Sequence, residues 1–408
     1  MKRMGDVVPD SDEVARLRAE VRAWLEANAP AKGSAADFSA AHIVSAATRE
    51  EFEAREHAAL DATRRWQRRL FDAGWAARSW AEEYGGRGGA PWEAEVVAEE
   101  QAGFGVSTKM LAIALEMVPP VLIHHGTHEQ RLTHLPRIAR GEEAWCQLLS
   151  EPDAGSDLTN VQAFASPVGG SGGGAAGAPE GGWTVTGQKV WTSGATSADF
   201  ALLLARTDRD APGRAGVSCF ALRMDQPGVE VRPLRQISGA YHFNEVFLDD
   251  ARLEPGQLIG SLGDGFAVLR TMLASERAAI GGGTSARSFA QLRGMAEATG
   301  RNHDPHVRQQ IARAYTRERL LDLVGERVGQ IPMGGSVAKL SYSEHARLTS
   351  SAALEILGPS ATVLDDPTSQ PWLDRFLFAP GLRLGGGTDE IQRNTIAERG
   401  LGLPREPA

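Results

Sequence analysis

The hydrophobic period of this chain changes twice, and these two changes limit the folds that it can adopt. Apolar residues recur at helical spacing through the first third, alternate at strand spacing through the middle, and return to helical spacing from about Gly263. The two periods place apolar residues on different kinds of face, so one uniform sheet or bundle cannot bury both. The pattern predicts three successive regions, helical, then β, then helical.

The predicted elements place the domain boundaries. Helical patterns cover 11–28, 48–73, 92–104, 108–117 and 130–139, and strand patterns cover 183–186, 189–192, 200–205, 217–222, 229–231 and 243–248. Helical patterns return at 264–298, 305–329, 332–357 and 388–400. We therefore expect an α+β multidomain fold. It would comprise an all-α domain over 1–143, a β-barrel or β-sandwich domain over 144–260, and a C-terminal four-helix bundle over 261–408.

Composition excludes several classes of function. The formal net charge of −9 argues against nucleic acid as the main partner, because a phosphate backbone needs a basic face. No apolar run is long enough for a membrane span, and no apolar core follows the basic start of the chain as in a signal peptide. The two cysteines, Cys146 and Cys219, cannot form a disulfide framework and fit a reducing cytoplasm. Either thiol could be catalytic, although buried spectator thiols are the commoner case.

A Gly- and Ala-rich run over 169–182 could in principle be a dinucleotide-binding loop. It has no Gly-x-Gly-x-x-Gly motif with a strand before it and a helix after it, and no Gly-Lys-Ser/Thr sequence. We therefore expect a flexible hairpin tip.

The stretch from Trp145 to Leu158 lies at the first change of period. A strand-like run, Trp145 to Leu149, stops at a polar turn that contains a Pro, a Gly and two Asp residues. Ligand clefts are common at domain junctions, so this turn is a candidate binding site. Judged from residue types alone, an ordinary strand end and loop is the favoured explanation.

One carboxylate lies on the apolar stripe of the helix that begins near Gly265. The stripe has spacings of three and four, and it consists of Phe266, Leu269, Leu273, Glu276 and Ile280. Burial would raise the pKa of Glu276, as a general base for a weak carbon acid requires. A salt bridge to Arg270 or Arg277 would explain the same pattern.

Four stretches together resemble the acyl-CoA dehydrogenase family over nearly the whole chain. Cys146 to Leu158 is similar to the family's Thr-Glu-Pro-x-Ala-Gly-Ser-Asp fingerprint, with Ser150 in place of Thr. Gly187 to Gly194 is similar to its flavin-facing segment, and Gly263 to Arg277 contains its Glu-Arg pair. The fourth stretch runs from Gly386 to Asn394 and is followed by the typical ending Arg399 to Arg405. The four occur in family order and at family spacing.

The resemblance implies a helical domain, a β domain and a four-helix bundle, with FAD held between the last two and shared across a subunit contact. It implies oxidation of an acyl-CoA thioester to the trans-2-enoyl-CoA: a carboxylate removes the α proton and the β hydrogen leaves as hydride to flavin N5. It also implies a homo-oligomer, dimer or tetramer, or a hetero-oligomer with a related subunit. An electron-transfer flavoprotein would be the electron acceptor, and no metal is expected.

Residue roles carry over where the motifs match. The resemblance implies that Ser150 and its backbone bond the flavin pyrimidine edge, that Trp191 packs on the isoalloxazine ring, and that Thr192 and Ser193 bond its edge. Ser156 would lie near the CoA arm, and Glu151 would stabilise the turn rather than act as a base. The other positions assigned to the cofactor are Gln147, Leu149, Thr388 and Glu390, and Arg277 is assigned to the substrate.

Two departures from the family pattern affect the site. Many members carry the catalytic Glu where this chain has Gly386, whereas isovaleryl- and long-chain-type members place it on the bundle helix before an Arg, as Glu276-Arg277 does here. We therefore expect Glu276 to be the base, and the N–H of Gly386 to support polarisation of the thioester carbonyl. The usual Arg-x-x-Phe-Gly segment that reaches the neighbouring subunit's FAD is missing, with Arg301 as a substitute.

Two alternative functions stay open. One is a flavin monooxygenase or oxidase on the same fold, against which Glu276 argues. The other is a non-catalytic or half-site subunit of a hetero-oligomer, which Gly386 and the missing arginine segment favour. The run Gly281 to Gly283 predicts either a roomy acyl pocket or close helix packing.

Overall fold

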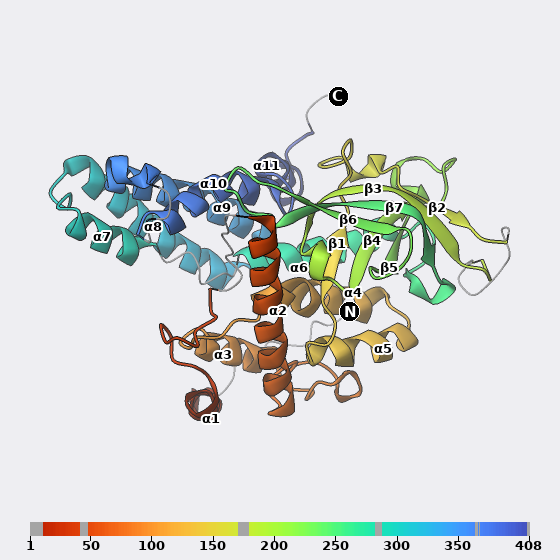
Figure 1. The fold of residues 1–408 in the computed structure, drawn as a ribbon, viewed down its shortest axis with the longest axis horizontal. Coiled ribbons are helices and arrows are strands. Elements are labelled where there is room, and N and C mark those ends of the chain that lie inside the picture. Colours follow the sequence, from red (N-terminus) through yellow and green to blue (C-terminus); the bar gives the residue numbers. More distant parts are fainter. Residues whose placement is uncertain are drawn as a thin grey trace. The chain divides into compact units, whose positions relative to one another are not determined.

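The structure is a computed structural model that describes residues 11–40, 48–169, 179–281, 288–363, 366 and 368–405, without the side chains of 277–281. The chain divides into two compact units, Met1–Leu269 and Arg270–Ala408 (Figure 1). No helix among the described residues is long and apolar enough to cross a membrane.

The first unit begins with helices α1 (Ser11–Asn28), α2 (Arg49–Asp72) and α3 (Pro91–Gln101), close to the predicted ranges. The Thr48 hydroxyl caps α2 by accepting the Glu51 N–H at 3.2 Å. The apolar stripes of these helices meet in one core, which includes Leu17, Val21, Leu25, Trp66, Leu70 and Val96.

The helix predicted over 108–117 takes a different form. A short 3₁₀ turn covers Lys109–Leu111, and a π-helix covers Ile113–Met117. The pattern also missed α4 (Val118–His125), because the pair Pro119-Pro120 reads as a helix stop, whereas prolines are tolerated in the first helical turn. Helix α5 (His128–Ala139) follows, and a reciprocal capping box between Thr127 and Gln130 begins it.

The β region forms one eight-stranded mixed sheet. Its strands follow the order β6-β7-β3-β2-β4-β5-β8, with β1 paired in parallel to β4. The bounds are β1 Trp145–Leu148, β2 Phe164–Pro167, β3 Trp183–Ser193, β4 Phe200–Arg206, β5 Val217–Arg223, β6 Val229–Leu234, β7 Phe243–Leu253 and β8 Leu258–Ile259. Strands β2 and β3 pair antiparallel on either side of the Gly-rich run, as a hairpin requires, and 170–178 lie outside the described residues.

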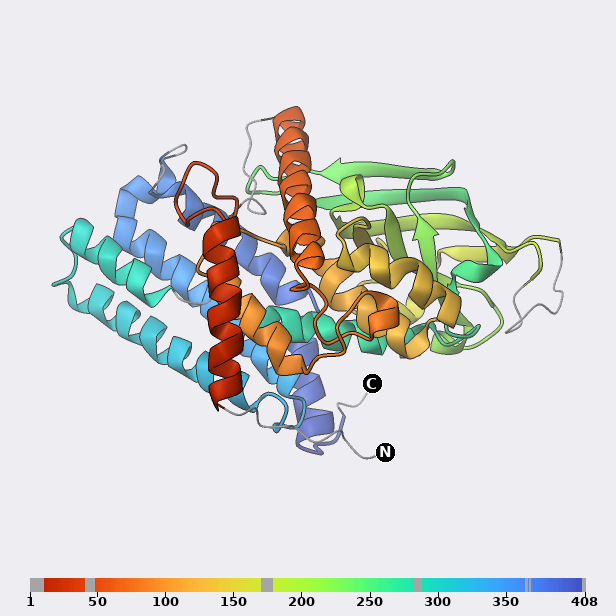
Figure 2. The same ribbon diagram turned by 90° about the horizontal axis from the view of Figure 1, so that it is seen from below.

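Helices α4 and α5 lie against one face of this sheet (Figure 2). The Gln130 amide donates to the carbonyls of Gly256 and Leu258 at 2.7 and 2.8 Å, and the Gly260 N–H donates to the His125 carbonyl. These bonds hold the sheet edge at β8 to the helical layer. The sheet and the N-terminal helices therefore form a single unit.

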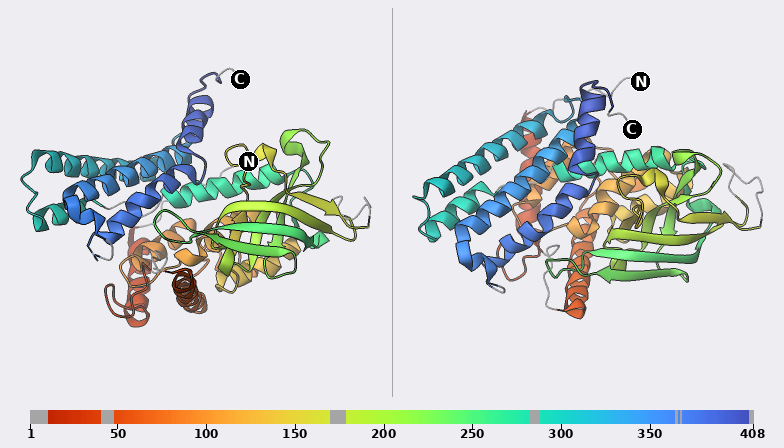
Figure 3. Two further views of the ribbon diagram at one scale, coloured as in Figure 1. Left: turned by 45° about the horizontal axis from the view of Figure 1, so that its top comes forward. Right: turned by 90° about the horizontal axis from the view of Figure 1, so that it is seen from above.

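The second unit consists of helices (Figure 3). Helix α6 (Gly265–Gly281) runs across the border between the units, followed by α7 (Phe289–Ala298), α8 (Pro305–Arg327), α9 (Gly334–Leu357), α10 (Gln370–Leu384) and α11 (Asp389–Thr395). Helices α7, α8 and α10 all pack on α9. Their core includes Leu292, Val307, Ala314, Ala353, Ile356 and Trp372.

Two helix predictions in this unit were wrong. The single helix expected over 264–298 is two helices, α6 and α7, and 282–287 between them lie outside the described residues. The sequence reading also missed α10, because Pro371 and Pro380 interrupt its pattern. The fourth bundle position thus belongs to α10, and the expected helix over 388–400 consists of the short α11 and a π-helical turn, Ile396–Gly400.

Candidate functional site

The fingerprint turn after β1 packs directly on β3. The Val190 N–H donates to the Ser150 carbonyl at 2.9 Å, which joins the turn to the segment that carries Trp191. The two sequence stretches assigned to the flavin from this unit are thus neighbours in space.

Trp191 lies in a strained bulge of β3. The pairing of β3 with β7 shifts register between Lys189 and Thr192, and Trp191 has a φ of +63°, a conformation that bulky residues avoid. Its indole is 60% exposed and meets the Phe243 ring edge-on at 6.0 Å. Strain of this kind is concentrated at ligand sites, so the bulge marks a functional surface.

The neighbouring hydroxyls of Thr192 and Ser193 lie on opposite faces of β3. Ser193 is exposed with Trp191, whereas Thr192 is 1% exposed. Among the described residues, the Thr192 hydroxyl has no hydrogen-bond partner, while its carbonyl accepts the Asn244 amide at 2.9 Å. Ser193 is therefore the hydroxyl placed to share a ligand with Trp191.

Glu151 stabilises the fingerprint turn, as predicted. Its carboxylate accepts the backbone N–H groups of Gln162 and Ala163 at 2.6 and 2.9 Å. It also pairs with the fully buried ammonium of Lys189 at 2.8 Å. All of these bonds are directed into the sheet, which leaves the carboxylate no access to a substrate.

Three further residues assigned from the sequence belong to the same region. The Gln147 amide contacts the Met117 sulfur at 3.0 Å, which ties β1 to the π-helix. Leu149 is half-buried, and its carbonyl accepts the Lys189 ammonium at 3.1 Å. Ser156 is exposed at the outer end of the turn.

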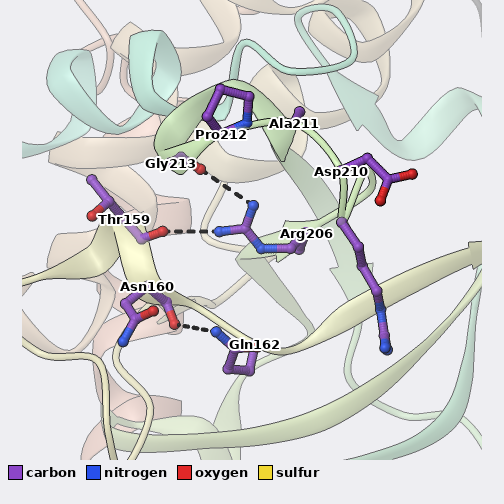
Figure 4. Close-up of a pocket in the computed structure, with 9 residues that line it drawn as sticks. Thr159, Asn160, Gln162, Arg206, Asp210, Ala211, Pro212 and Gly213 are labelled. Atoms are coloured by element: carbon purple, nitrogen blue, oxygen red, sulfur yellow. Dashed lines mark hydrogen bonds between the residues drawn. The ribbon is translucent and has the colours of Figure 1, made fainter.

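A polar hollow of about 480 Å³ lies between the segment that follows the fingerprint turn and the loop after β4 (Figure 4). Its lining comprises Thr159, Asn160, Gln162, Arg206, Arg209 and 210–213. The Arg206 guanidinium has a structural role. It donates hydrogen bonds to three backbone carbonyls, those of Thr159, Val161 and Gly213. The Arg209 guanidinium lies 4.2 Å from the centre of the Phe164 ring, and the carboxylate of Asp210 also lines the hollow.

Both cysteine thiols are buried. Desolvation raises the pKa of Cys146 and that of Cys219 to about 12. A thiol that stays protonated at neutral pH is a poor nucleophile. The structure therefore confirms that both thiols are buried, as the interpretation of spectator thiols requires.

Helix α6 presents a different buried face from the one predicted. Val268, Leu269 and Met272 are the deeply buried residues, and Glu276, which helical spacing places on the same face, is half-buried. The spacing argument selected a stripe shifted toward Phe266 and Leu273, which are only half-buried, because it counted apolar residues without knowing what packs on the helix. The side chains of Arg277 and Ile280 lie outside the described residues.

The C-terminal motif forms a glycine turn that leads into α11. Gly386 and Gly387 have φ values of +66° and +89°, so a side chain at either position would be strained. The Gln392 amide donates to both of their carbonyls, at 2.8 and 3.1 Å. The Thr388 hydroxyl caps α11 by accepting the Ile391 N–H, and Glu390 is exposed on the first turn.

Arg301 forms its hydrogen bonds with residues of its own chain. Its guanidinium donates to Asp304 at 2.7 Å and to the Glu355 carbonyl, at the junction of α7 and α8. This contact fixes the start of α8, whose N-cap is Asp304. The suggested role toward a neighbouring subunit's FAD stays a prediction.

The sequence reading missed the buried cations of the site. Lys189 was grouped with a strand and given no role, and Lys339 was not singled out, although each is 0% exposed and paired with a carboxylate. The available signal was a lysine at an inward position of an otherwise apolar pattern. Such a residue needs a buried partner.

Comparison with known families identifies the class of protein. Three family models match in succession: the N-terminal domain of acyl-CoA dehydrogenase over 30–142, the middle domain over 146–251 and the C-terminal domain over 263–401. The chain therefore belongs to the acyl-CoA dehydrogenase family, and it is an oxidoreductase by membership.

Full-length relatives support this assignment. Acyl-CoA dehydrogenase IpdE1 of Mycolicibacterium smegmatis is 37% identical over 400 residues, covering 97% of this chain and 99% of the relative. IpdE1 of Mycobacterium tuberculosis is 36% identical over 403 residues, with the same coverage.

Solved structures agree on the fold. The Tcur3481-Tcur3483 steroid ACAD matches with a TM-score of 0.77 at 24% identity, over 98% of this chain and 99% of that one. A chain of the ChsE4-ChsE5 complex from Mycobacterium tuberculosis matches with a TM-score of 0.74 at 24% identity, over 98% and 100%. Together they confirm the helical, β and helical domain order.

Proposed function

We propose that this chain catalyses the FAD-dependent α,β-dehydrogenation of an acyl-CoA thioester to the trans-2-enoyl-CoA, with Glu276 as the base. Membership of the family supplies the reaction class. Two observations support the assignment: Glu276 on α6 is half-buried, and Gly386 has a left-handed backbone conformation. The backbone at 386 disfavours the carboxylate that many members carry there.

The residues of the first unit fit a flavin. An exposed indole on a strained bulge offers a flat apolar face, and the exposed Ser193 beside it offers a hydroxyl. The half-buried Ser150 lies one hydrogen bond away from this bulge. Trp191, Ser193 and Ser150 would hold the ring system, and bound FAD would supply the hydride acceptor.

Two residues of the chain would act on the α proton and on the thioester carbonyl of the substrate. The Glu276 carboxylate would accept the α proton of the thioester. The N–H of Gly386 would donate to the thioester carbonyl oxygen and so acidify the α carbon. Both roles require few solvent molecules around the reacting atoms, which the half-buried setting of Glu276 and the buried setting of Gly386 favour.

The polar hollow lined by Thr159 and Arg209 supports a CoA ester as the substrate. A CoA nucleotide carries several phosphate charges, and the Arg209 guanidinium at the hollow is suited to receive them. The hollow begins at Thr159, three residues past Ser156, which was assigned to the CoA arm. We accordingly place the nucleotide end of the substrate there.

Substitution Glu276→Gln tests the proposal. We expect the rate of flavin reduction by acyl-CoA to fall roughly 100- to 10,000-fold while FAD stays bound, because a positioned base is lost without a change of shape. The matched control is Glu297→Gln on α7, where the carboxylate forms an exposed pair with Arg293. Normal enoyl-CoA formation by Glu276→Gln with bound FAD would refute the role of Glu276.

A second candidate is a subunit that supplies part of a shared site to a related chain. Gly386 lacks a side chain, the arginine segment toward a neighbouring FAD is missing, and the chain has the fold of a ChsE4-ChsE5 complex member. Purification of the chain alone, followed by its visible spectrum, separates the two candidates. Bound flavin in the isolated chain supports the complete enzyme, and flavin that appears only with a second subunit supports the shared site.

The electron acceptor is part of the same proposal. We expect reduced enzyme to pass electrons to an electron-transfer flavoprotein and to reoxidise slowly in air. Stopped-flow mixing of reduced enzyme with oxygen, or with that protein, measures both rates. Fast reaction with oxygen would favour the oxidase or monooxygenase alternative.

A further inference from the structure

We propose that Lys189, a residue with no access to substrate, is a positioning residue that holds the Ser150 turn and the Trp191 bulge in the geometry that receives the flavin. This inference rests on the proposed FAD site and adds a residue to it. Three hydrogen bonds that one buried ammonium group donates support this inference.

The Lys189 ammonium reaches three oxygen atoms on two segments, strand β4 and the turn around Ser150. It donates to the Leu204 carbonyl at 2.7 Å, to Glu151 Oε1 at 2.8 Å and to the Leu149 carbonyl at 3.1 Å. An ammonium has three donors, so this set satisfies it fully. Strand β4 and the two sides of Ser150 are thereby attached to one point on β3.

The position of Ser150 follows from these bonds. Leu149 and Glu151, its neighbours on either side, both bond Lys189, and its own carbonyl accepts the N–H of Val190. The turn therefore has little freedom to move relative to β3. Because fixed donors and acceptors bind a ligand without an ordering cost, such a turn is pre-organised for a cofactor edge.

Trp191 depends on the same anchor. It comes two residues after Lys189, at the register shift, and it adopts its left-handed conformation with a mostly exposed side chain. Little packing holds the indole in place from outside. The anchored segment, Lys189 and Val190, is what opposes relaxation of the bulge.

A direct chemical role for Lys189 does not fit its surroundings. Its side chain is 0% exposed, and burial lowers its pKa although Glu151 opposes the shift. Glu151 is equally committed, since its carboxylate also accepts the N–H groups of Gln162 and Ala163. The pair therefore acts on the flavin only through the backbone that it holds.

The experiment compares Lys189→Met, the neutralised pair Lys189→Met/Glu151→Gln, and the control Glu143→Gln. Glu143 is the matched residue, because it forms a buried cluster with His134 and Trp145 at the opposite end of β1. Three quantities are measured: the free energy of unfolding in denaturant, the Kd of the apoprotein for FAD, and the ¹⁹F resonance of 5-fluorotryptophan at 191. The resonance is assigned by its disappearance in Trp191→Phe.

We expect both Lys189 variants to bind FAD at least about tenfold more weakly, the equivalent of one displaced hydrogen bond, and to shift or broaden the Trp191 resonance. The neutralised pair should regain stability without regaining FAD affinity, because it leaves no buried charge unpaired. Glu143→Gln should lose stability while its Kd and Trp191 resonance stay unchanged.

Two results would overturn the inference. One is a neutralised pair that regains wild-type FAD affinity together with its stability, since Lys189 would then be a stability residue only. The other is a Trp191 resonance that stays unchanged in both Lys189 variants. That resonance is read in flavin-free protein, so it tests Lys189 even if the chain bound no FAD and the proposed function failed.

Discussion

Lys339 and Asp389 form an ion pair at 2.9 Å in which neither side chain is exposed. Asp389 directly follows the Gly386–Thr388 turn, and it also accepts the hydroxyl of Ser343 at 2.7 Å and the guanidinium of Arg383 at 2.7 Å. A buried carboxylate in the second unit thus anchors the glycine turn much as Glu151 anchors the fingerprint turn in the first.

We predict that Asp389→Asn lowers the free energy of unfolding by about 3–5 kcal/mol, because it leaves the Lys339 ammonium buried without its counter-charge. Urea denaturation followed by circular dichroism measures the change. The control is Arg405→Ala, which breaks a largely exposed pair with Glu398 and should have a far smaller effect. Equal losses in the two variants would contradict the prediction.

From the burial of Glu56 on α2, we predict that the free energy of unfolding depends on pH. Burial raises its pKa above the ordinary value of 4.5, although the Thr196 hydroxyl, which donates to it at 3.0 Å, opposes the shift. A raised pKa means that folding favours the protonated form of Glu56. The contribution of Glu56 to stability is therefore fully present below pH 4.5, and it is lost as pH rises through the folded-state pKa. Glu56→Gln should therefore be more stable than wild type at pH 8, with the gap closing toward pH 4.5.

Denaturant titrations at several pH values test this expectation. Asp61→Asn is the control, since Asp61 is exposed on the same helix. A stability difference between Glu56→Gln and wild type that does not vary with pH would contradict the assignment of the raised pKa to Glu56.

Arg209 predicts where the CoA nucleotide binds. Arg209→Ala should raise KM for acyl-CoA roughly tenfold with little change in kcat, because it removes binding that is equal in the ground and transition states. The rate with the truncated acyl-pantetheine ester should not change, since that ester lacks the nucleotide. Arg223→Ala, whose side chain is exposed and paired with Asp225, serves as the control. A loss with both substrates would place Arg209 elsewhere in the reaction.

The strained bulge at Trp191 predicts that glycine is more stable than alanine at this position, the reverse of the usual order in a strand. A residue other than glycine at φ +63° is strained, so Trp191→Gly should be more stable than Trp191→Ala by about 1 kcal/mol. Elsewhere in a strand, glycine is the less stable of the two. Thermal and urea denaturation of the two variants measure the difference, and a more stable alanine variant would show that the bulge is not strained.

The elements that the sequence predicted well are those with local signals. Helix α1 has Val21 and Leu25 at helical spacing, and β4 and β5 are apolar runs between turn residues. Helices α4 and α10 were missed because Pro119, Pro120 and Pro380 look like stop signals, although Pro119 and Pro120 lie in the first turn of α4, where proline is tolerated. Site residues on motifs, such as Ser150 and Trp191, could be named because the motifs are short and contiguous.

The sequence by itself determined the domain order, the family and the position of the candidate base Glu276, since each of these depends on local periodicity or on a contiguous motif. Only the tertiary structure decided that Lys189 lies under Ser150, that Thr192 is turned away from Trp191, and that the buried face of α6 runs through Val268 rather than Phe266. The physical reason is that burial and long-range hydrogen bonds join residues far apart in the chain. The spacing of residues along the chain does not determine which distant residues meet. Strand register and helix orientation determine that.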